Sequence, residues 1–250
     1  MLKLNKINVS FGSHHVLKNT TCSAQAGDFI VIVGTNGAGK STFFDTIAGK
    51  TLPESGTITL DGVDVTQKNE QARASLVTRI FQNTSLNSVG SLTVWQNLAL
   101  AQYSRKSAEL RDGMIAMPRN KAEELMYQLG LPVFMLDKKM QSLSGGQRQL
   151  IAFGMATLHI PKILLLDEPT AALDPQASTK LLSHAVSFIK KNKVTTLLIT
   201  HDPQIALSIG NKIWILDQGV ITKEFNETDK KNLHPDQLIG HIDYEKLAAL

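Results

Sequence analysis

The sequence predicts an α/β fold with a mostly parallel sheet that helices cover. Short apolar runs of strand length alternate with stretches of helical periodicity, first across residues 29–49 and again from residue 162 onward. Strands that alternate with helices are typical of parallel sheets, because a parallel pair needs a long crossover connection. Residues 90–157 are helical in pattern and interrupt this alternation, so we expect a helical insertion there.

Composition and charge limit the class of protein. The chain has 250 residues, of which 42% are hydrophobic and 19% charged, which is enough for one large domain or two small ones. The net charge of +4 suits nucleic acid, an anionic membrane surface or an anionic ligand, and it selects none of them. Cys22 is the single cysteine, which excludes an intrachain disulfide and fits a reducing cytosol.

Two features favour a soluble protein. The N-terminus lacks an apolar segment of signal-peptide length. The longest apolar tract, residues 150–166, approaches the length of a membrane span, but Pro161 and Lys162 interrupt it. We interpret the tract as a buried helix end, a turn and a core strand, and expect any role at a membrane to depend on docking to another protein.

The N-terminal part of the chain combines predicted strands with one helix. β-prone runs separated by Gly and Asn occupy residues 2–34. Residues 41–49 have a helical pattern that Gly49 closes. Residues 56–65 indicate a strand pair with Asp61-Gly62 as its turn.

Helical patterns dominate the middle of the chain, and strands return after it. Three segments are predicted helices: residues 91–104, 119–131 and 144–158. Three later segments are predicted strands: residues 162–169, 194–202 and 212–221. We expect an exposed connection over residues 104–120, a helix over residues 176–192 and a polar, weakly helical tail from residue 229.

The stretch IVIVGTNGAGKST leads from a buried strand into a glycine-rich loop and a helix. In this context the pattern G-x-x-x-x-G-K-[ST] is met by Gly34, Gly39, Lys40 and Ser41. A backbone without Cβ atoms can curl around phosphate, and the helix N-terminus adds partial positive charge. We expect Lys40 to reach the β and γ phosphates, Ser41 to ligate Mg²⁺ and Thr42 to bind an α-phosphate oxygen. The alternative is a plain glycine-rich turn.

The apolar strand KILLLDEP ends in two carboxylates. Asp167 stands at its C-terminal end, where ligands bind in open α/β sheets. We expect Asp167 to hold the Mg²⁺ water shell and Glu168 to act as general base for the attacking water. Adjacent side chains on a strand point to opposite faces, so both reach the nucleotide only if the chain turns there. An acidic surface turn is the alternative.

The stretch LSGGQRQ offers a second anion site. Ser144, Gly145 and Gly146 present backbone N–H groups ahead of a helix. Ser144 as N-cap and Gln147 three residues later also fit a capping box, and both interpretations can hold together. The chain therefore carries two phosphate-binding devices but one complete catalytic loop.

The glycine-rich loop, LSGGQ and ILLLDEP, in this order, resemble the ATP-binding cassette family, the motor subunits of ABC transporters. The resemblance covers about residues 2–225 and implies a P-loop ATPase core with a mostly parallel sheet, an N-terminal antiparallel β subdomain and an inserted α-helical subdomain. We expect the ATPase domain at residues 1–228, its helical subdomain at about 83–157 and a short helical tail at 229–250.

The resemblance implies further site residues. Phe11 matches the aromatic that stacks on adenine, where most members have Tyr; a core aromatic is the alternative. Gln82 matches the glutamine that senses Mg²⁺ and the attacking water, and His201 matches the histidine that contacts the γ-phosphate. Asp174 matches the aspartate that links two nucleotide sites. The remaining nucleotide-binding residues of the loop are Asn36, Gly37 and Ala38. After the signature the chain departs from the family, since it has LIAFGMATL where most members have RVAIARAL.

In this family two cassettes enclose ATP head to tail, which implies a homodimer whose Ser144, Gly145, Gly146 and Gln147 act on the partner's ATP. It also implies ATP and Mg²⁺ as cofactors, separate membrane permease subunits, an extracytoplasmic solute-binding protein and a place at the cytoplasmic face of the inner membrane. The chain resembles importers of amino-acid-type solutes. The alternatives are an exporter motor, a nucleic-acid-associated ATPase and a regulatory module that holds ATP. The single cassette, the slight basic charge and the Glu168 and His201 pair argue against the last two, so we expect no nucleic-acid partner.

Overall fold

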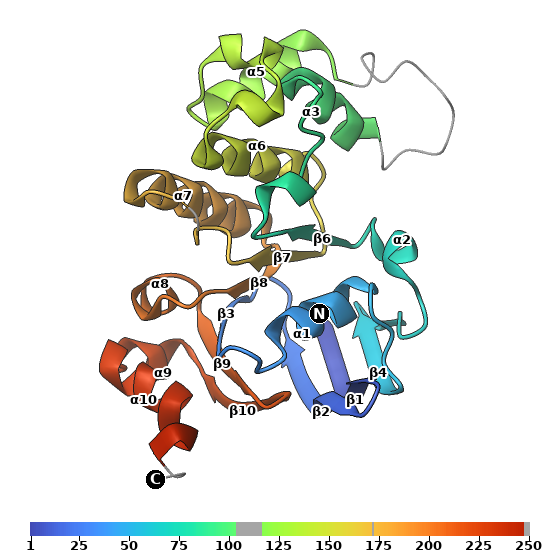
Figure 1. Cartoon of the computed structure of the whole chain (residues 1–250), viewed down its shortest axis with the longest axis vertical. Coiled ribbons are helices and arrows are strands. Elements are labelled where there is room, and N and C mark those ends of the chain that lie inside the picture. Colours follow the sequence, from blue (N-terminus) through green and yellow to red (C-terminus); the bar gives the residue numbers. More distant parts are fainter. Residues whose placement is uncertain (104–116, 172, 248–250) are drawn as a thin grey trace. The chain divides into compact units, whose positions relative to one another are not determined.

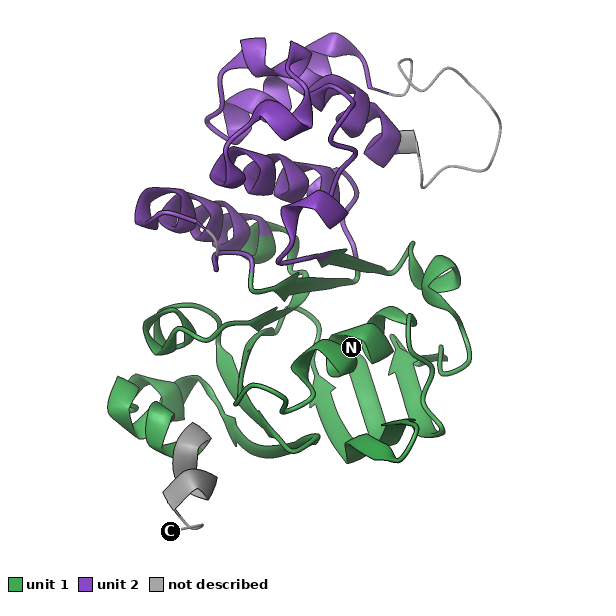
Figure 2. Cartoon of the chain, in the orientation of Figure 1, with its two compact units in different colours: residues 1–79, 162–168, 189–250 green, residues 80–161, 169–188 purple. Residues whose placement is uncertain are grey.

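The computed structural model describes residues 1–103, 117–171 and 173–247, and the chain divides into two compact units (Figure 2). Unit 1 is made of residues 1–79, 162–168 and 189–250. Unit 2 is made of residues 80–161 and 169–188.

An antiparallel sheet of four strands lies in the N-terminal part of unit 1, in the order β2–β1–β4–β5 (Figure 1). Its strands are β1 (Leu2–Phe11), β2 (His14–Ala24), β4 (Ser55–Leu60) and β5 (Val63–Asp64). Along β1 the apolar side chains of Leu2, Leu4, Ile7 and Val9 are buried, which is the alternation of a half-covered strand, displaced by one residue between Leu4 and Ile7, where the pairing with β2 is irregular. Asp61 and Gly62 join β4 to β5 with φ of 48° and 81°, which confirms the predicted turn.

A second sheet has six strands in the order β10–β9–β3–β8–β7–β6. Its strands are β3 (Phe29–Val33), β6 (Val77–Ile80), β7 (Ile163–Asp167), β8 (Thr195–Ile199), β9 (Lys212–Asp217) and β10 (Val220–Phe225). β3 pairs parallel with β8 and β9, and β7 pairs parallel with β8. All residues of β3 and β8 are buried, as expected where helices or other strands cover both faces. The mostly parallel sheet predicted from the sequence is confirmed.

One predicted strand is wrong in its extent. Residues 212–221 do not form a single strand, because the chain reverses at Gln218 and Gly219 and continues as β10, antiparallel to β9. Both turn residues have left-handed backbone, with φ of 42° and 81°, as a two-residue hairpin requires.

The described residues of unit 1 include the helices α1 (Lys40–Ala48), α2 (Glu70–Arg73), α8 (Pro203–Ser208), α9 (Glu227–Lys231) and α10 (Pro235–Leu247). α1 ends at Gly49, whose φ of 83° and hydrogen bonds to Asp45 and Thr46 carbonyls confirm the predicted stop. Phe43, Phe44 and Ile47 are fully buried and pack in one apolar cluster with strands of both sheets. This packing fixes the helix that follows the glycine-rich loop.

Helices make up most of unit 2, as the sequence predicts (Figure 1). They are α3 (Val94–Tyr103), α5 (Arg119–Gln128), α6 (Gly145–Thr157) and most of α7 (Pro175–Asn192), with short 3₁₀ helices η1 (Thr84–Leu86), η2 (Val133–Asp137) and η3 (Met140–Ser142). Of the connection expected at 104–120, residues 104–116 lie outside the described residues. Its end is not exposed as expected, because Met117 is buried and its carbonyl accepts from Trp95 Nε1 at 2.8 Å.

The apolar tract at residues 150–166 is divided as predicted. It contains the end of α6, a turn and the start of β7. In the part of the chain that the structure describes, no helix combines the length and apolar character needed to cross a bilayer.

Candidate active site

The glycine-rich loop connects the C-terminal end of β3 to α1. A Cβ added to Gly34 would stand 2.1 Å from the carbonyl oxygen of Leu216 on β9, so only glycine fits this approach. Gly39 is the N-cap of α1 and has φ of 97°, a conformation that L side chains rarely adopt. The loop therefore takes its shape from close packing against β9 at one end and from a left-handed residue at the other.

Lys40 lies buried inside this loop, with a relative exposure of 8%. Its Nζ donates to the carbonyl oxygens of Gly34 at 2.9 Å and Thr35 at 2.8 Å. Burial lowers the pKa of Lys40, and the charges of Glu168 and Asp167 act in the opposite direction. The ammonium group is thus held by loop carbonyls close to the N-terminus of α1, where an anion would also find helix N–H groups.

Glu168 stands where the chain turns at the end of β7. Its φ of 46° is left-handed, and its N–H donates to the carbonyl oxygen of Ile199 on β8 at 3.1 Å. His201, two residues beyond the end of β8, places Nε2 2.5 Å from Glu168 Oε1. Because a carboxylate only accepts, Nε2 is the donor in this contact. Both carboxylates could reach a nucleotide only if the chain turned at the end of the strand, and the structure has this turn at Glu168.

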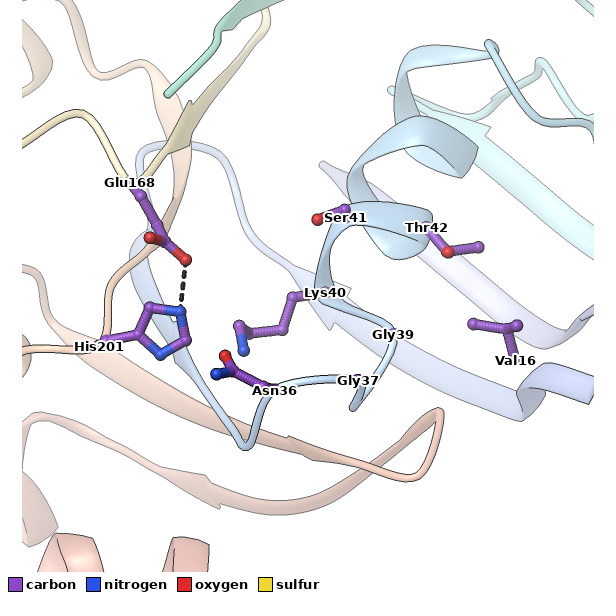
Figure 3. A pocket seen from close by; sticks show the side chains of 9 residues that line it. All are labelled: Val16, Asn36, Gly37, Gly39, Lys40, Ser41, Thr42, Glu168 and His201. Carbon is purple, nitrogen blue, oxygen red and sulfur yellow. Dashed lines mark ion pairs between the residues drawn. The ribbon is translucent and has the colours of Figure 1, made fainter. Parts of the chain in front are cut away.

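A pocket of about 250 Å³ joins the loop to this pair (Figure 3). Its lining residues all belong to unit 1: Val16, Asn36, Gly37, Gly39, Lys40, Ser41, Thr42, Glu168 and His201. Figure 3 shows the ion-paired Glu168 and His201 on one side and the loop with the start of α1 on the other. An anionic ligand in this pocket would lie between a phosphate-binding loop and a candidate general base.

Three predicted nucleotide-site residues do not line the pocket. Gly34 and Ala38 are buried in the loop. Phe11 ends β1 with its side chain 54% exposed, so the alternative of a core aromatic is excluded. Sequence reasoning missed Val16 on β2, which does line the pocket. Its only signal in the sequence is its position a few residues after Phe11.

Asp167 has a partner that sequence reasoning also missed. Its Oδ2 accepts from Arg79 Nη2 at 2.5 Å, and Arg79 Nη1 contacts Asp45 Oδ1 on α1. The Arg79 side chain is only 8% exposed. The first carboxylate of KILLLDEP is therefore fixed by an ion pair rather than directed freely into the pocket.

The signature residues lie in unit 2, at the start of α6. Ser144 Oγ accepts from the N–H of Gln147, and Gln147 Oε1 accepts from the N–H of Ser144, which confirms the capping box. A Cβ added to Gly146 would stand 2.7 Å from Ala177 Cβ on α7. Gly146 thus lets α7 approach the signature closely, while Gly145 occupies the first turn of α6.

Gln82 and Asp174 also lie in unit 2. Gln82 is exposed in the loop between β6 and η1. Asp174 precedes α7 and accepts through Oδ1 from the N–H of Ala177 at 2.9 Å, so it caps this helix.

Polar contacts join the residues directly after the signature to the loop that carries Gln82. Gln149 on α6 is buried, and its Nε2 donates to the carbonyl oxygen of Phe81 at 3.4 Å. Asn87 closes the same loop through two bonds of 2.9 Å to the backbone of Phe81. Arg148 Nε donates to Thr84 Oγ1 at 3.3 Å. Within unit 2, α6 therefore contacts the loop that carries Gln82.

Comparisons with known proteins agree with this geometry. Residues 17–171 match the family model described as ABC transporter. A tyrosine transport ATP-binding protein of Clostridioides difficile is 34% identical over 250 residues, with 98% of this chain and 99% of that protein covered. The arginine transport ATP-binding protein ArtM of Bacillus subtilis is 31% identical, with 90% and 91% covered. A dimeric structure of the ATP-binding cassette MJ0796 bound to ADP and Pi has a TM-score of 0.78 and 27% identity, with 91% of this chain and 99% of that chain covered.

Proposed function

Because this chain belongs to the ABC transporter family, we propose that it is the ATP-hydrolysing subunit of an importer and that it works with separate membrane permease subunits. The match to the family model confirms the family expected from the sequence. The observation that carries the proposal is the pocket in which the phosphate-binding loop faces Glu168 and His201.

Different residues of the proposed site have different roles in nucleotide binding and hydrolysis. Lys40 and the N–H groups at the start of α1 bind the β and γ phosphates, and Thr42 binds the α-phosphate. Glu168 takes the proton of the attacking water, because it is the carboxylate that lines the pocket. His201 fixes the orientation of that carboxylate through its contact of 2.5 Å and reaches the γ-phosphate. Phe11 stacks on the adenine from the exposed end of β1.

The oxygen donors near the pocket fit Mg²⁺. Ser41, which lines the pocket, offers a hydroxyl, and Asp167, whose charge acts on Lys40, offers a carboxylate. Mg²⁺ prefers one or two such ligands together with substrate phosphates. No cluster of three or more His, Cys, Asp or Glu side chains suited to a metal occurs among the described residues, so nothing in this part of the chain offers a cage for another ion. When bound, the ion would neutralise the charge that develops on the phosphates. A role of Gln82 toward Mg²⁺ is proposed from the family resemblance alone.

A second copy of the chain completes the site in this proposal. Ser144, Gly145, Gly146 and Gln147 act on the nucleotide held by the partner, and Asp174 links the two sites. The dimer of the related cassette MJ0796 supports this arrangement. ATP closes the homodimer and hydrolysis opens it, which moves the permease subunits.

The names of relatives support an imported solute of amino-acid type. Those with tyrosine and arginine transport in their names match this chain over 99% and 91% of their own lengths. We therefore propose an extracytoplasmic amino-acid-binding protein as a further partner and the cytoplasmic face of the inner membrane as the location. We assign the ATPase domain to residues 1–228, its helical subdomain to about 83–157 and the tail to 229–250.

Phosphate release from MgATP tests the proposed chemistry. We expect Glu168→Gln to lower turnover at least about 100-fold, because a general base contributes that much or more, and to leave ATP binding intact. Glu227→Gln is the matched control, since Glu227 is an exposed glutamate on α9. Full turnover in the Glu168 variant would refute the assignment. Purification of the tagged chain from membranes tests the transport role. A multispanning permease should purify with it, and purification without one would count against the role.

A further inference from the structure

Arg79 on β6 lies between two acidic side chains that belong to different parts of unit 1. Its Nη2 donates to Asp167 Oδ2 at 2.5 Å, and its Nη1 contacts Asp45 Oδ1. The guanidinium also lies 5.7 Å from the centre of the Phe44 ring, which is fully buried. Because the Arg79 side chain is 8% exposed and the two carboxylates are 22% and 14% exposed, these contacts are shielded from solvent.

The two carboxylates connect Arg79 to both halves of the nucleotide pocket. Asp45 belongs to α1, the helix that begins with Lys40 and Ser41. Asp167 ends β7 and directly precedes Glu168. Arginine suits this position, because its planar fork can donate to two carboxylates at once, whereas a lysine ammonium is a point charge.

From these contacts we propose that Arg79 is a positioning residue, which holds the Asp167 carboxylate by tying it to Asp45 of α1 and thereby sets how strongly Mg²⁺ promotes nucleotide binding. The inference rests on the proposed role of Asp167 toward Mg²⁺. A carboxylate held at one oxygen by a buried guanidinium keeps one rotamer, so its remaining lone pairs point in a fixed direction. A carboxylate without this contact must lose rotamer freedom when the cation arrives.

Asp45 balances the charge of Arg79. The effect of Arg79 on the orientation of the Asp167 carboxylate can therefore be tested separately from its effect on the charge of the site. Asp45 carries the opposite charge on the same guanidinium, so the pair leaves the charge of Asp167 available to a cation. Replacing Arg79 alone would add net negative charge near the site and attract Mg²⁺ for a reason unrelated to orientation. The double change Arg79→Met with Asp45→Asn removes both charges and frees Asp167.

The experiment measures the affinity for trinitrophenyl-ATP by fluorescence, first in EDTA and then in a titration with Mg²⁺. In EDTA we expect the double variant to bind within about twofold of wild type, because neither substituted residue is among those that line the pocket. The Mg²⁺ concentration that gives half of the increase in affinity should rise about 10- to 100-fold, the range for loss of a group that orients a metal ligand.

The matched control is Arg119→Met with Asp137→Asn. In this exposed pair in unit 2 the guanidinium donates to both oxygens of one carboxylate, at 2.6 and 2.7 Å, and its removal should leave the Mg²⁺ titration unchanged. Arg79→Lys is the second test variant. It keeps the charge, cannot serve both carboxylates equally, and should shift the Mg²⁺ midpoint in the same direction even if the double variant does not fold.

The outcomes distinguish this inference from the proposed function. If both Arg79 variants have the same Mg²⁺ midpoint as wild type, Arg79 only supports the fold. This result would overturn the inference and leave the proposed function standing. A wild-type protein whose affinity does not depend on Mg²⁺ would overturn the role of Asp167 and the inference with it. Paramagnetic resonance of bound Mn²⁺ gives the same comparison without hydrolysis.

Discussion

Gly219 and Gly62 allow one packing contact near the active site to be measured against a matched reference. Both glycines are the second residue of a two-residue hairpin turn, and both have φ of 81°. They differ in surroundings. A Cβ added at Gly62 meets nothing within 4 Å, whereas one added at Gly219 would stand 1.9 Å from the carbonyl oxygen of Val16.

The difference in unfolding free energy follows from these surroundings. Alanine at either site adopts a left-handed conformation, which costs about 1 kcal/mol. At Gly219 the Val16 carbonyl must also move, which adds about 1–3 kcal/mol of overpacking. The same substitution would weaken the 3.1 Å hydrogen bond from the Lys18 N–H to the Gly219 carbonyl, which costs about 1 kcal/mol. We therefore expect Gly219→Ala to destabilise the chain by about 3 kcal/mol more than Gly62→Ala.

Thermal and urea unfolding of the two variants measure this difference. For a chain of this size, about 3 kcal/mol corresponds to a separation of about 6–12 °C in midpoint. Gly219→Ala should also weaken ATP binding, because Val16 lines the pocket and the Gly219 N–H donates to the carbonyl of Ala38 at 3.0 Å. Equal midpoints for the two variants would refute the argument from close packing.

Three further substitutions test individual side chains of the proposed nucleotide site. Lys40→Ala removes a buried ammonium and should weaken ATP binding about 10- to 100-fold, as measured by calorimetry; unchanged affinity would contradict the interpretation of the loop. Phe11→Ala should lower ATP affinity about tenfold without changing stability, whereas Phe134→Ala, which removes another exposed ring, should change neither. His201→Ala should lower turnover at least about 100-fold and retain ATP binding, and His234→Ala should match wild type; equal turnover in both would remove His201 from the mechanism.

Features that depend on neighbouring residues were predictable from the sequence. The stop of α1 at Gly49, the turn at Asp61 and Gly62, and the Ser144 capping box each involve residues within a few positions of one another. Local chemistry alone decides these conformations, so the motif and its context were sufficient.

Features that depend on strand order were not predictable. Arg79 and Asp167 are 88 positions apart and meet only because β6 lies next to β7 in the sheet. Val16 reaches the pocket because β2 passes close to Gly39, where an added Cβ would stand 3.3 Å from the Val16 side chain. No pattern in the sequence gives the pairing of strands separated by helices.

The hairpin at Gln218 and Gly219 was missed for a different reason. It has the same left-handed geometry as the turn at Asp61 and Gly62. Gln lacks the short side chain that makes Asp or Asn a recognised first residue of such turns, and apolar residues 213–216 and 220–221 lie on either side of the short polar stretch at 217–219. The glycine alone was the available signal, and a glycine inside a strand pattern also indicates a bulge.

The association state of Glu168→Gln in saturating MgATP tests the central claim, that two copies of the chain enclose ATP. Size-exclusion chromatography with light scattering gives the mass directly, and adding Lys40→Ala to this variant provides the nucleotide-free control. We expect Glu168→Gln to elute at twice the chain mass of 27.4 kDa and the control to elute as a monomer. A Glu168→Gln protein that binds ATP and stays at 27.4 kDa, even with its permease present, would contradict the account.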